Sequence, residues 1–336
     1  MKIAFTSCFD ALDDADQQVW DRVAEHEPDI LLLLGDSIYM DFGLPFMSTH
    51  PLGKPRGWGP AKFAEEMYSR YRKQSQVSSF RSLVQSVGHV GAIWDDHDFA
   101  WNSACGVPNT EARGKNVVPR DKKLISRSLH MQFRAWLRER PLLEQYPTPP
   151  TMEQMLSGPD KGIQESFDVG PVRFLMLDGR YYREEQNEPR RNPEGPFIDP
   201  FADEAEDVPL TSLLGASQRT WLSSRITEWP GIHIICSGQA LSGKKSDDWE
   251  HYSDLEWLAK QRFRKTVFLS GDIHDIKMKG HEELGGMWEF TASGAARPRL
   301  GGASGNFGII EVSANGLEAS LYDEDGLDKT RRISFQ

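Results

Sequence analysis

Three short apolar runs constrain this chain most strongly, because each one stops abruptly at acidic or histidine residues. The runs are DILLLLGDSIY (29–39), GAIWDDHD (91–98) and TVFLSGDIHD (266–275). A short run that is apolar throughout is typical of a strand buried on both faces of a sheet. In open α/β sheets, ligands bind beyond the carboxyl ends of such strands. Polar residues from all three runs are therefore expected to gather at one sheet edge.

The residues at these run ends have the chemistry of metal ligands. Asp36 and Asp272 each follow a glycine, which allows the tight backbone turn that presents a carboxylate over a sheet edge. His97 and His274 lie close by in the sequence, and Asp96 belongs to a group of adjacent carboxylates that repel one another unless a cation or hydrogen bonds neutralise them. Two alternatives stay open: turn acids that cap helices, and a solvated acidic loop.

Cys8 and Tyr39 extend the candidate set. Cys8 lies at the end of a further apolar segment, IAFTSCFD (3–10), which is the first predicted strand of the chain. That strand would end at the same sheet edge. A free cysteine is otherwise a small buried hydrophobe, and a tyrosine is otherwise a core residue, so both interpretations are kept for each residue.

Composition excludes several classes of protein. The 336 residues carry 50 acidic and 39 Lys and Arg side chains, a net charge of −11, which disfavours long nucleic acids as partners. No run reaches the eighteen or so apolar residues of a membrane span. Three widely spaced cysteines argue against a disulfide framework. Because no signal peptide precedes the first predicted strand, a cytoplasmic location is expected.

The order of predicted elements favours one elaborated α/β domain over residues 1–336. Strands alternate with helices early in the chain and follow one another later, which indicates a mixed sheet or two sheets packed face to face. Helices are expected over 14–26, 60–87, 120–139 and 217–229. Long loop insertions, which are often functional lids, are expected over 41–60, 102–120, 147–165 and 183–212.

A family resemblance rests on motifs in a fixed order. SCFD, GDSIYMD, WDDHDFAWN, LDGRYYR, ASQRTWL, CSGQAL and LSGDIHDI resemble the PhoD-like alkaline phosphatases of the calcineurin-like metallophosphatase superfamily, over residues 6 to 300. The chain departs from that family in lacking its common secretory signal and in the short segments between motifs. The resemblance implies a four-layer α/β/β/α sandwich with mixed sheets and a multinuclear metal centre.

The resemblance also implies a ligand set. Cys8, Asp36 and Tyr39 would hold an Fe³⁺-like ion, and Asp36 would bridge to a second ion. The second ion, Ca²⁺ by resemblance, would be held by Asp96, Asp272 and Asn102, and His274 matches a further ligand position. Thiolate and phenolate suit ferric iron, whereas calcium prefers oxygen ligands. Mn²⁺ and Zn²⁺ stay open as alternatives.

The expected activity is the hydrolysis of small phosphate mono- or diesters. We expect a metal-bound hydroxide to attack phosphorus and His97 to protonate the leaving oxygen, with a role of His97 as ligand or supporting donor as the alternative. Arg180 is a candidate phosphate donor or, equally, half of a structural Arg–Asp pair. The alternative function is a metal-poor fold that binds proteins, and oligomeric state stays open.

Overall fold

Two six-stranded sheets form the centre of the protein. The computed structural model describes residues 1–41, 54–109, 114–186, 210–243, 247–261, 263–297 and 305–335. The first sheet has the order β12-β11-β10-β1-β2-β3 and the second the order β4-β5-β6-β7-β9-β8. The strands of the first are β1 (Lys2–Thr6), β2 (Ile30–Leu34), β3 (His89–Ile93), β10 (Phe307–Ser313), β11 (Gly316–Asp323) and β12 (Gly326–Ser334). Those of the second are β4 (Glu165–Val169), β5 (Val172–Met176), β6 (Ile232–Cys236), β7 (Thr266–Ser270), β8 (Ile276–His281) and β9 (Met287–Ala292).

Both sheets are mixed. Strands β1, β2 and β3 run parallel, while β10 pairs antiparallel with β1. In the second sheet β5, β6, β7 and β9 are parallel, and the edge strands β4 and β8 pair antiparallel with their neighbours. Parallel strands carry their carboxyl ends to one edge, so the segments after β1, β2 and β3 emerge together.

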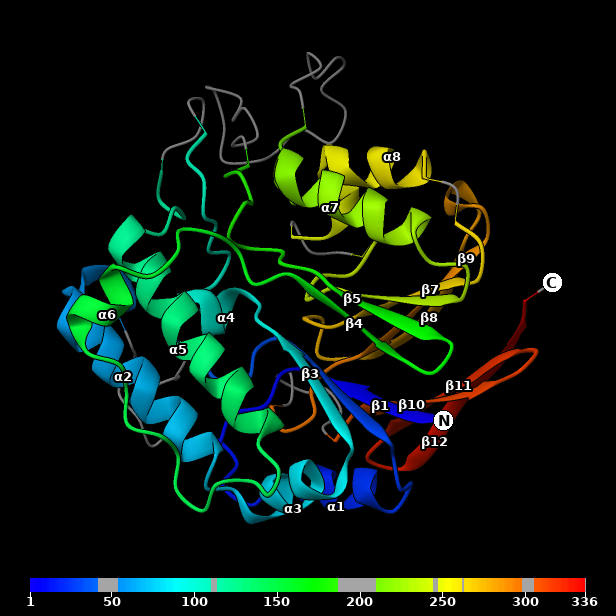
Figure 1. Ribbon diagram of the computed structural model, residues 1–336, viewed down its shortest axis with the longest axis horizontal. Coiled ribbons are helices and arrows are strands. Elements are labelled where there is room, and N and C mark those ends of the chain that lie inside the picture. Colours follow the sequence, from blue (N-terminus) through cyan, green and yellow to red (C-terminus); the bar gives the residue numbers. More distant parts are fainter. Residues whose placement is uncertain are drawn as a thin grey trace, which may run out of the picture.

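Helices flank the sheets (Figure 1). The helices α1 to α6 lie on the side of the first sheet, and α7 and α8 cover the second sheet. Their bounds are α1 (Val19–Ala24), α2 (Pro60–Gln74), α3 (Ser78–Ser86), α4 (Asp96–Phe99), α5 (Arg120–Arg138), α6 (Met152–Leu156), α7 (Gly215–Thr227) and α8 (Ser253–Ala259). Short 3₁₀ turns lie at Pro55–Gly57, Trp249–His251 and Glu282–Leu284.

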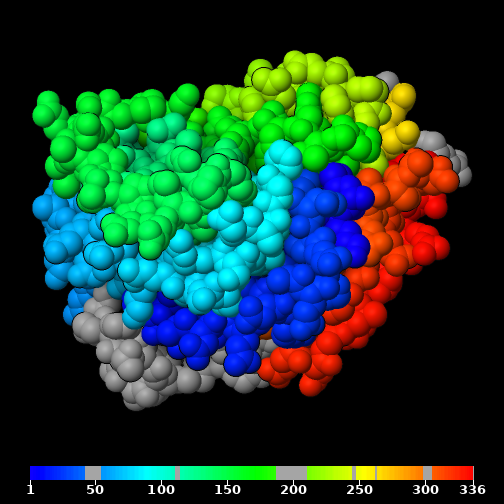
Figure 2. All heavy atoms as spheres, turned by 60° about the horizontal axis from the view of Figure 1, so that its bottom comes forward, coloured from blue at the N-terminus to red at the C-terminus, as the bar shows by residue number. Residues whose placement is uncertain are grey.

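The first strands and the last ones share a surface of the molecule. In Figure 2 the N-terminal segment, in blue, lies directly beside the C-terminal strands, in red. The pairing of β1 with β10 accounts for this arrangement, with Lys2 opposite Glu311 and Phe5 opposite Gly308. The two ends of the chain therefore belong to one sheet.

Side chains that alternate along a strand point to opposite faces of the sheet, and they therefore belong to two separate hydrophobic clusters. Ile234 and Cys236 of β6 belong to the large cluster that joins the two sheets and the helices of the first. Ile235, one residue along, faces the opposite way and packs with Leu222 of α7 and Leu258 of α8. The predicted four-layer α/β/β/α sandwich is confirmed, and the alternative of a single mixed sheet is excluded.

Two predicted helices differ from the structure. The helix expected over 60–87 is two helices, because Val77 adopts an extended conformation (φ −63°, ψ 118°) and buries its side chain between them. The helix expected over 14–26 is helical only at Val19–Ala24. Asp14 instead accepts hydrogen bonds from the amides of Asp16 and Gln17, which holds the preceding residues in a turn.

Among the expected loop insertions, 147–165 contains helix α6 and the first residue of β4. Residues 42–53 and 187–209, which make up most of 41–60 and 183–212, lie outside the described residues, as do residues 110–113 of 102–120. No helix in the described part of the chain is long and apolar enough to span a membrane.

Candidate metal centre

Five of the seven residues expected to hold metal come together, and they come from two sheets rather than from the single sheet edge that was expected. Cys8 follows β1, Asp36 follows β2 and Asp96 follows β3, while Asp272 and His274 follow β7 of the second sheet. Among the described residues, three overlapping groups have potential ligand atoms that all lie within 4.8 Å of one another. The groups are Cys8, Asp36 and His274; Asp36, Asp96 and His97; and Asp36, Asp95, Asp96 and Asp272. Asp36 belongs to all three.

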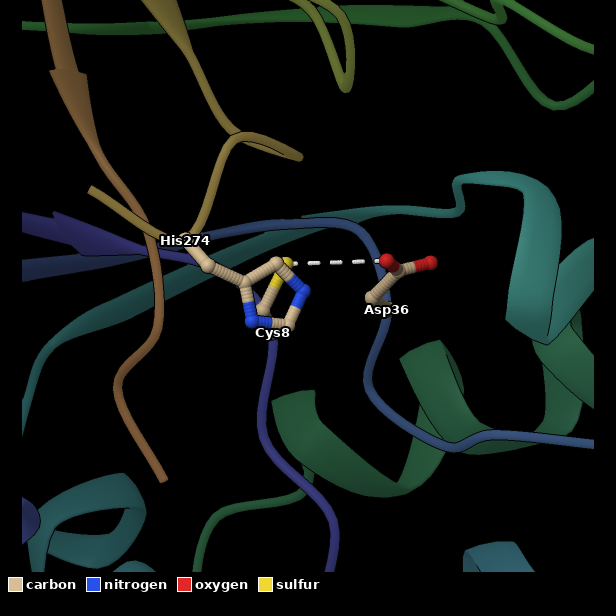
Figure 3. Close-up of side chains that lie close together, drawn as sticks. All are labelled: Cys8, Asp36 and His274. Carbon is tan, nitrogen blue, oxygen red and sulfur yellow. Dashed lines mark hydrogen bonds between the residues drawn. The ribbon is translucent and has the colours of Figure 1, made fainter. Parts of the chain in front are cut away.

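The first group combines sulfur, oxygen and nitrogen donors. The thiol of Cys8 lies 3.5 Å from Asp36 Oδ2, and His274 reaches the same place from the opposite sheet (Figure 3). Tyr39 joins this group, because its hydroxyl lies 3.2 Å from His274 Nε2. Burial raises the pKa of the Cys8 thiol and holds the pKa of Tyr39 well above its usual value, since either anion would be desolvated.

The group of four acids consists of carboxylates alone. Burial raises the pKa of Asp95 to about 8, with Asp96 and Asp272 adding to the shift and Arg180 opposing it. Burial, with the neighbouring Cys8, also raises the pKa of Asp36 well above its usual range. Burial therefore disfavours the ionised forms of Asp36 and Asp95, and a bound cation would favour them.

One carboxylate oxygen of the group of four acids indicates a bound cation. Asp95 Oδ2 is buried and has no hydrogen-bond partner in the described part of the chain. An orphaned carboxylate oxygen in a group of four acids is costly, and a cation offsets that cost. The residues present therefore fit metal ions, with mixed donors on the Cys8 side and oxygen donors on the Asp95 and Asp96 side.

Four candidate ligands share an unusual backbone conformation. Cys8, Asp36, Asp272 and His274 have φ values of 60°, 52°, 65° and 51°, in the left-handed region that residues other than glycine rarely adopt. Each such residue costs on the order of 1–3 kcal/mol, and such positions cluster at functional sites. The surrounding fold therefore holds these side chains in place against a local backbone preference.

The two glycines before Asp36 and Asp272 act differently. Gly35 has a φ of 96°, and a Cβ on it would lie 2.6 Å from Asp95 Cβ. At Gly271 only space is at issue: a Cβ would lie 2.5 Å from the Ser7 hydroxyl and 2.9 Å from the Leu34 carbonyl oxygen. The tight turn expected at both positions is present: Gly35 itself adopts the left-handed conformation, whereas at Gly271 the turn is closed by the N–H of Ile273, which donates to the Gly271 carbonyl at 2.8 Å, and the missing side chain leaves room for Ser7 and Leu34.

His97 is oriented by an acid that sequence analysis did not single out. Its Nδ1 lies 2.6 Å from Asp41 Oδ1, and Asp41 Oδ2 accepts the backbone N–H of Asn102 at 2.7 Å. Burial alone would lower the pKa of His97, but Asp96, Asp41 and Asp36 outweigh burial and raise the pKa to about 10. Asp41 ends the motif GDSIYMD, so its place in that motif was the available signal.

The adjacent acids of WDDHD separate into distinct positions. Asp98 accepts the backbone N–H groups of Asp95 and Ser37, which fixes the turn into α4. Asp96 Oδ2 accepts the N–H of Ser103 at 2.6 Å. Asn102 is exposed, and its amide group donates to the Ser103 hydroxyl at 3.2 Å, so its predicted role as a ligand stays a prediction.

Arg180 is buried in an ion-pair network. Its Nε lies 2.6 Å from Asp95 Oδ1, its Nη1 2.9 Å from Asp247 Oδ2, and its side chain is fully buried. The structural pair expected from sequence therefore exists, with Asp95 and Asp247 as its partners. Asp178, the acid nearest in sequence, accepts a hydrogen bond from the backbone N–H of Arg180 rather than from its guanidinium.

A four-layer α/β/β/α sandwich with candidate metal ligands at the carboxyl ends of its strands defines the metallophosphatase class of fold. A family model described as "PhoD-like phosphatase" matches residues 3–323. The chain belongs to the PhoD-like phosphatase family, whose members are hydrolases of phosphate esters.

A solved structure shares the fold. The structure titled "Structure of PhoD" has a TM-score of 0.67 at 17% identity, covering 100% of this chain and 72% of that one. Weaker likenesses include the phosphoesterase Yfce from E. coli (TM-score 0.34, 12% identity, 100% of both chains) and TT1561 of Thermus thermophilus (TM-score 0.38, 12% identity, 100% and 99%). No curated protein matches the chain.

Proposed function

We propose that this phosphoesterase depends on at least two metal ions bridged by Asp36 and that it hydrolyses phosphate mono- or diesters. The observation that carries the proposal is the presence of Asp36 in all three groups of candidate ligands, beside His97. Cys8, Tyr39 and His274 would hold an ion that accepts mixed donors, such as Fe³⁺, on one side. Asp96, Asp272 and Asn102 would hold an oxygen-preferring ion such as Ca²⁺ on the other, with Mn²⁺ and Zn²⁺ as alternatives.

When bound, the ions would supply an activated water at neutral pH and neutralise charge on the phosphate. The contribution of the protein is to place a proton. A carboxylate can only accept, so the contact with Asp41 assigns the proton on Nδ1 of His97. Nε2, which lies 3.9 Å from Asp96 Oδ1, is then the nitrogen that would protonate the leaving oxygen.

Arg180 would act through the carboxylates. Its guanidinium is held by Asp95 and Asp247, and Nη2 lies 3.9 Å from Asp96 Oδ2. This placement supports a role in orienting Asp95 and Asp96. Direct contact with phosphate stays a prediction, which would require Nη2 to reach the substrate.

The test is His97→Asn, assayed on p-nitrophenyl phosphate and bis-p-nitrophenyl phosphate after chelation and metal add-back. We expect turnover to fall about 10²- to 10⁴-fold, the usual contribution of general acid–base catalysis, while metal content stays at the wild-type level. His251→Asn, whose side chain is 47% exposed, is the matched control.

Other outcomes separate the alternatives. Loss of metal together with turnover would make His97 a ligand, and unchanged turnover would overturn the acid role. The ratio of rates on the two substrates decides between monoester and diester preference. A wild-type protein that binds no metal and hydrolyses neither ester would favour the protein-binding module.

A further inference from the structure

The segment after β9, residues 293–297 (SGAAR), packs against the Cys8 side of the centre. The hydroxyl of Ser293 donates to Cys8 Sγ at 3.2 Å and accepts the backbone N–H of His274 at 3.0 Å. The amides of Gly294 and Ala295 both donate to the Ser7 carbonyl at 3.1 Å, and the amide that follows donates to the Cys8 carbonyl at 3.3 Å. One short segment is thus tied to the turns that carry two candidate ligands.

The last residue of this segment fixes the proton on His274. Nδ1 of His274 lies 2.7 Å from the carbonyl oxygen of Arg297. A carbonyl can only accept a hydrogen bond, so Nδ1 carries the proton in the neutral ring. Nε2 is then the nitrogen with a lone pair, and it is the one that faces the Tyr39 hydroxyl at 3.2 Å. Metal-binding histidines are commonly oriented in this way by a carbonyl on the other nitrogen.

The side chain of the same arginine reaches a third candidate ligand. The Arg297 guanidinium lies 3.9 Å from the centre of the Tyr39 ring, a cation–π contact. Its Nη1 lies 3.1 Å from Asp10 Oδ2 and also pairs with Asp13, and the residue is 8% exposed. Asp10 and Asp13 therefore hold the Arg297 guanidinium against the Tyr39 ring.

We propose that Arg297 is a positioning residue of the metal centre, which sets the binding nitrogen of His274 through its carbonyl and supports Tyr39 as an anionic ligand through its guanidinium. This inference rests on the proposed function for the identity of the ligands. Cys8, Asp36 and Tyr39 would together bring three negative charges to one ion, and a fixed cation beside Tyr39 offsets part of that charge. With iron bound, the same cation would lower the energy of the electrons that the Tyr39 phenolate donates.

The test compares wild type, Arg297→Met, Arg297→Lys and the control Arg331→Met. Arg331 lies 4.1 Å from the centre of the Trp288 ring, so its loss removes the same charge and the same type of contact from an exposed strand. Each protein is chelated, loaded with Fe³⁺ and Ca²⁺, and followed by its phenolate-to-iron absorption band and by iron titration.

We expect Arg297→Met to shift the band to longer wavelength and to weaken iron binding about 10- to 100-fold, the usual effect of removing a residue that supports a ligand. Arg297→Lys keeps the charge and should give an intermediate band even if the Met variant folds poorly. Arg331→Met should match wild type. An unchanged band and unchanged iron binding in both Arg297 variants would overturn the role of the guanidinium.

A second measurement needs no metal. The ¹⁵N-histidine spectrum of the metal-free wild type should show His274 protonated on Nδ1, with the signal assigned by its loss in His274→Gln. Protonation on Nε2 would overturn the role of the carbonyl. If the proton lies on Nδ1 but no iron band forms in the wild type, the iron assignment of the proposed function fails and the positioning of His274 stands.

Discussion

The candidate ligands on the two sides of Asp36 differ in their chemical groups. On one side lie a thiol, a phenol and an imidazole, from Cys8, Tyr39 and His274. On the other side the potential ligand groups of Asp95, Asp96 and Asp272 are all carboxylates. Neutral donors can be buried together at modest cost, whereas adjacent carboxylates need cations.

The arginines reflect this difference. Arg180 makes direct ion pairs with the carboxylate side, through Asp95 at 2.6 Å. Arg297 contacts the other side through a ring face and a carbonyl, and its ion pairs go to Asp10 and Asp13. One side is thus held by charge, and the other by hydrogen bonds and by the packing of a short segment.

The largest expected effect follows from removing the residue that both sides share. Asp36→Asn should abolish binding of both ions and lower turnover by more than about 10³-fold, because a shared ligand supports every step that needs metal. Elemental analysis and p-nitrophenyl phosphate turnover measure the two effects.

Cys8→Ser changes the candidate ligands on one side of Asp36 only, so it is compared with Asp36→Asn. It removes a donor from one group only, so one ion should be lost or exchanged and the other retained. Retention of both ions by Asp36→Asn would contradict the bridging role. Asp21→Asn, on the exposed face of α1, controls for the loss of a carboxylate.

The next effect concerns the stability of the carboxylate side. Arg180→Met should lower the free energy of unfolding by about 3–5 kcal/mol, because it leaves the buried Asp95 without its ion-pair partner, whereas Asp247 keeps its pair with Arg183. Arg332→Met should cost less than about 1 kcal/mol, since Arg332 is 79% exposed in its pair with Glu318. Urea unfolding of the metal-free proteins measures both.

Adding Asp95→Asn to Arg180→Met should recover part of the lost stability, because it removes one unpaired charge. A cost for Arg180→Met no larger than that of Arg332→Met would show that the buried network contributes little to stability.

A further expected effect is the pH dependence of the metal-free protein. In the folded state burial raises the pKa of Asp95 to about 8, from an ordinary value near 3.8. A carboxyl whose folded pKa is raised contributes stability that is complete below its unfolded pKa and is lost as the pH rises through the folded one. The metal-free protein should therefore melt at a lower temperature at pH 8 than at pH 5.

Bound metal should weaken or reverse this trend, because it stabilises the ionised carboxylates. Thermal melts at both pH values, with chelator and with added metal, test the prediction. A metal-free protein that is more stable at pH 8 than at pH 5 would contradict the assignment of Asp95 as a buried, metal-dependent acid.

Local pattern was enough to locate most of the candidate site. The apolar runs before Asp36, Asp96 and Asp272 predicted buried strands, and β2, β3 and β7 lie there. The ends of helices were less predictable: the break at Val77 depends on where one buried side chain fits, which periodicity does not contain.

The sequence by itself determined the layered α/β class, the family and the set of residues with ligand chemistry, because strand burial and motif order are local properties of the chain. Only the tertiary structure decided which groups meet: Asp41 with His97, Arg180 with Asp95 and Asp247, and Arg297 with Tyr39 and His274. The contacts of Arg180 with Asp95 and of Arg297 with Tyr39 join segments that follow strands of different sheets, and no local pattern in the chain brings such segments together.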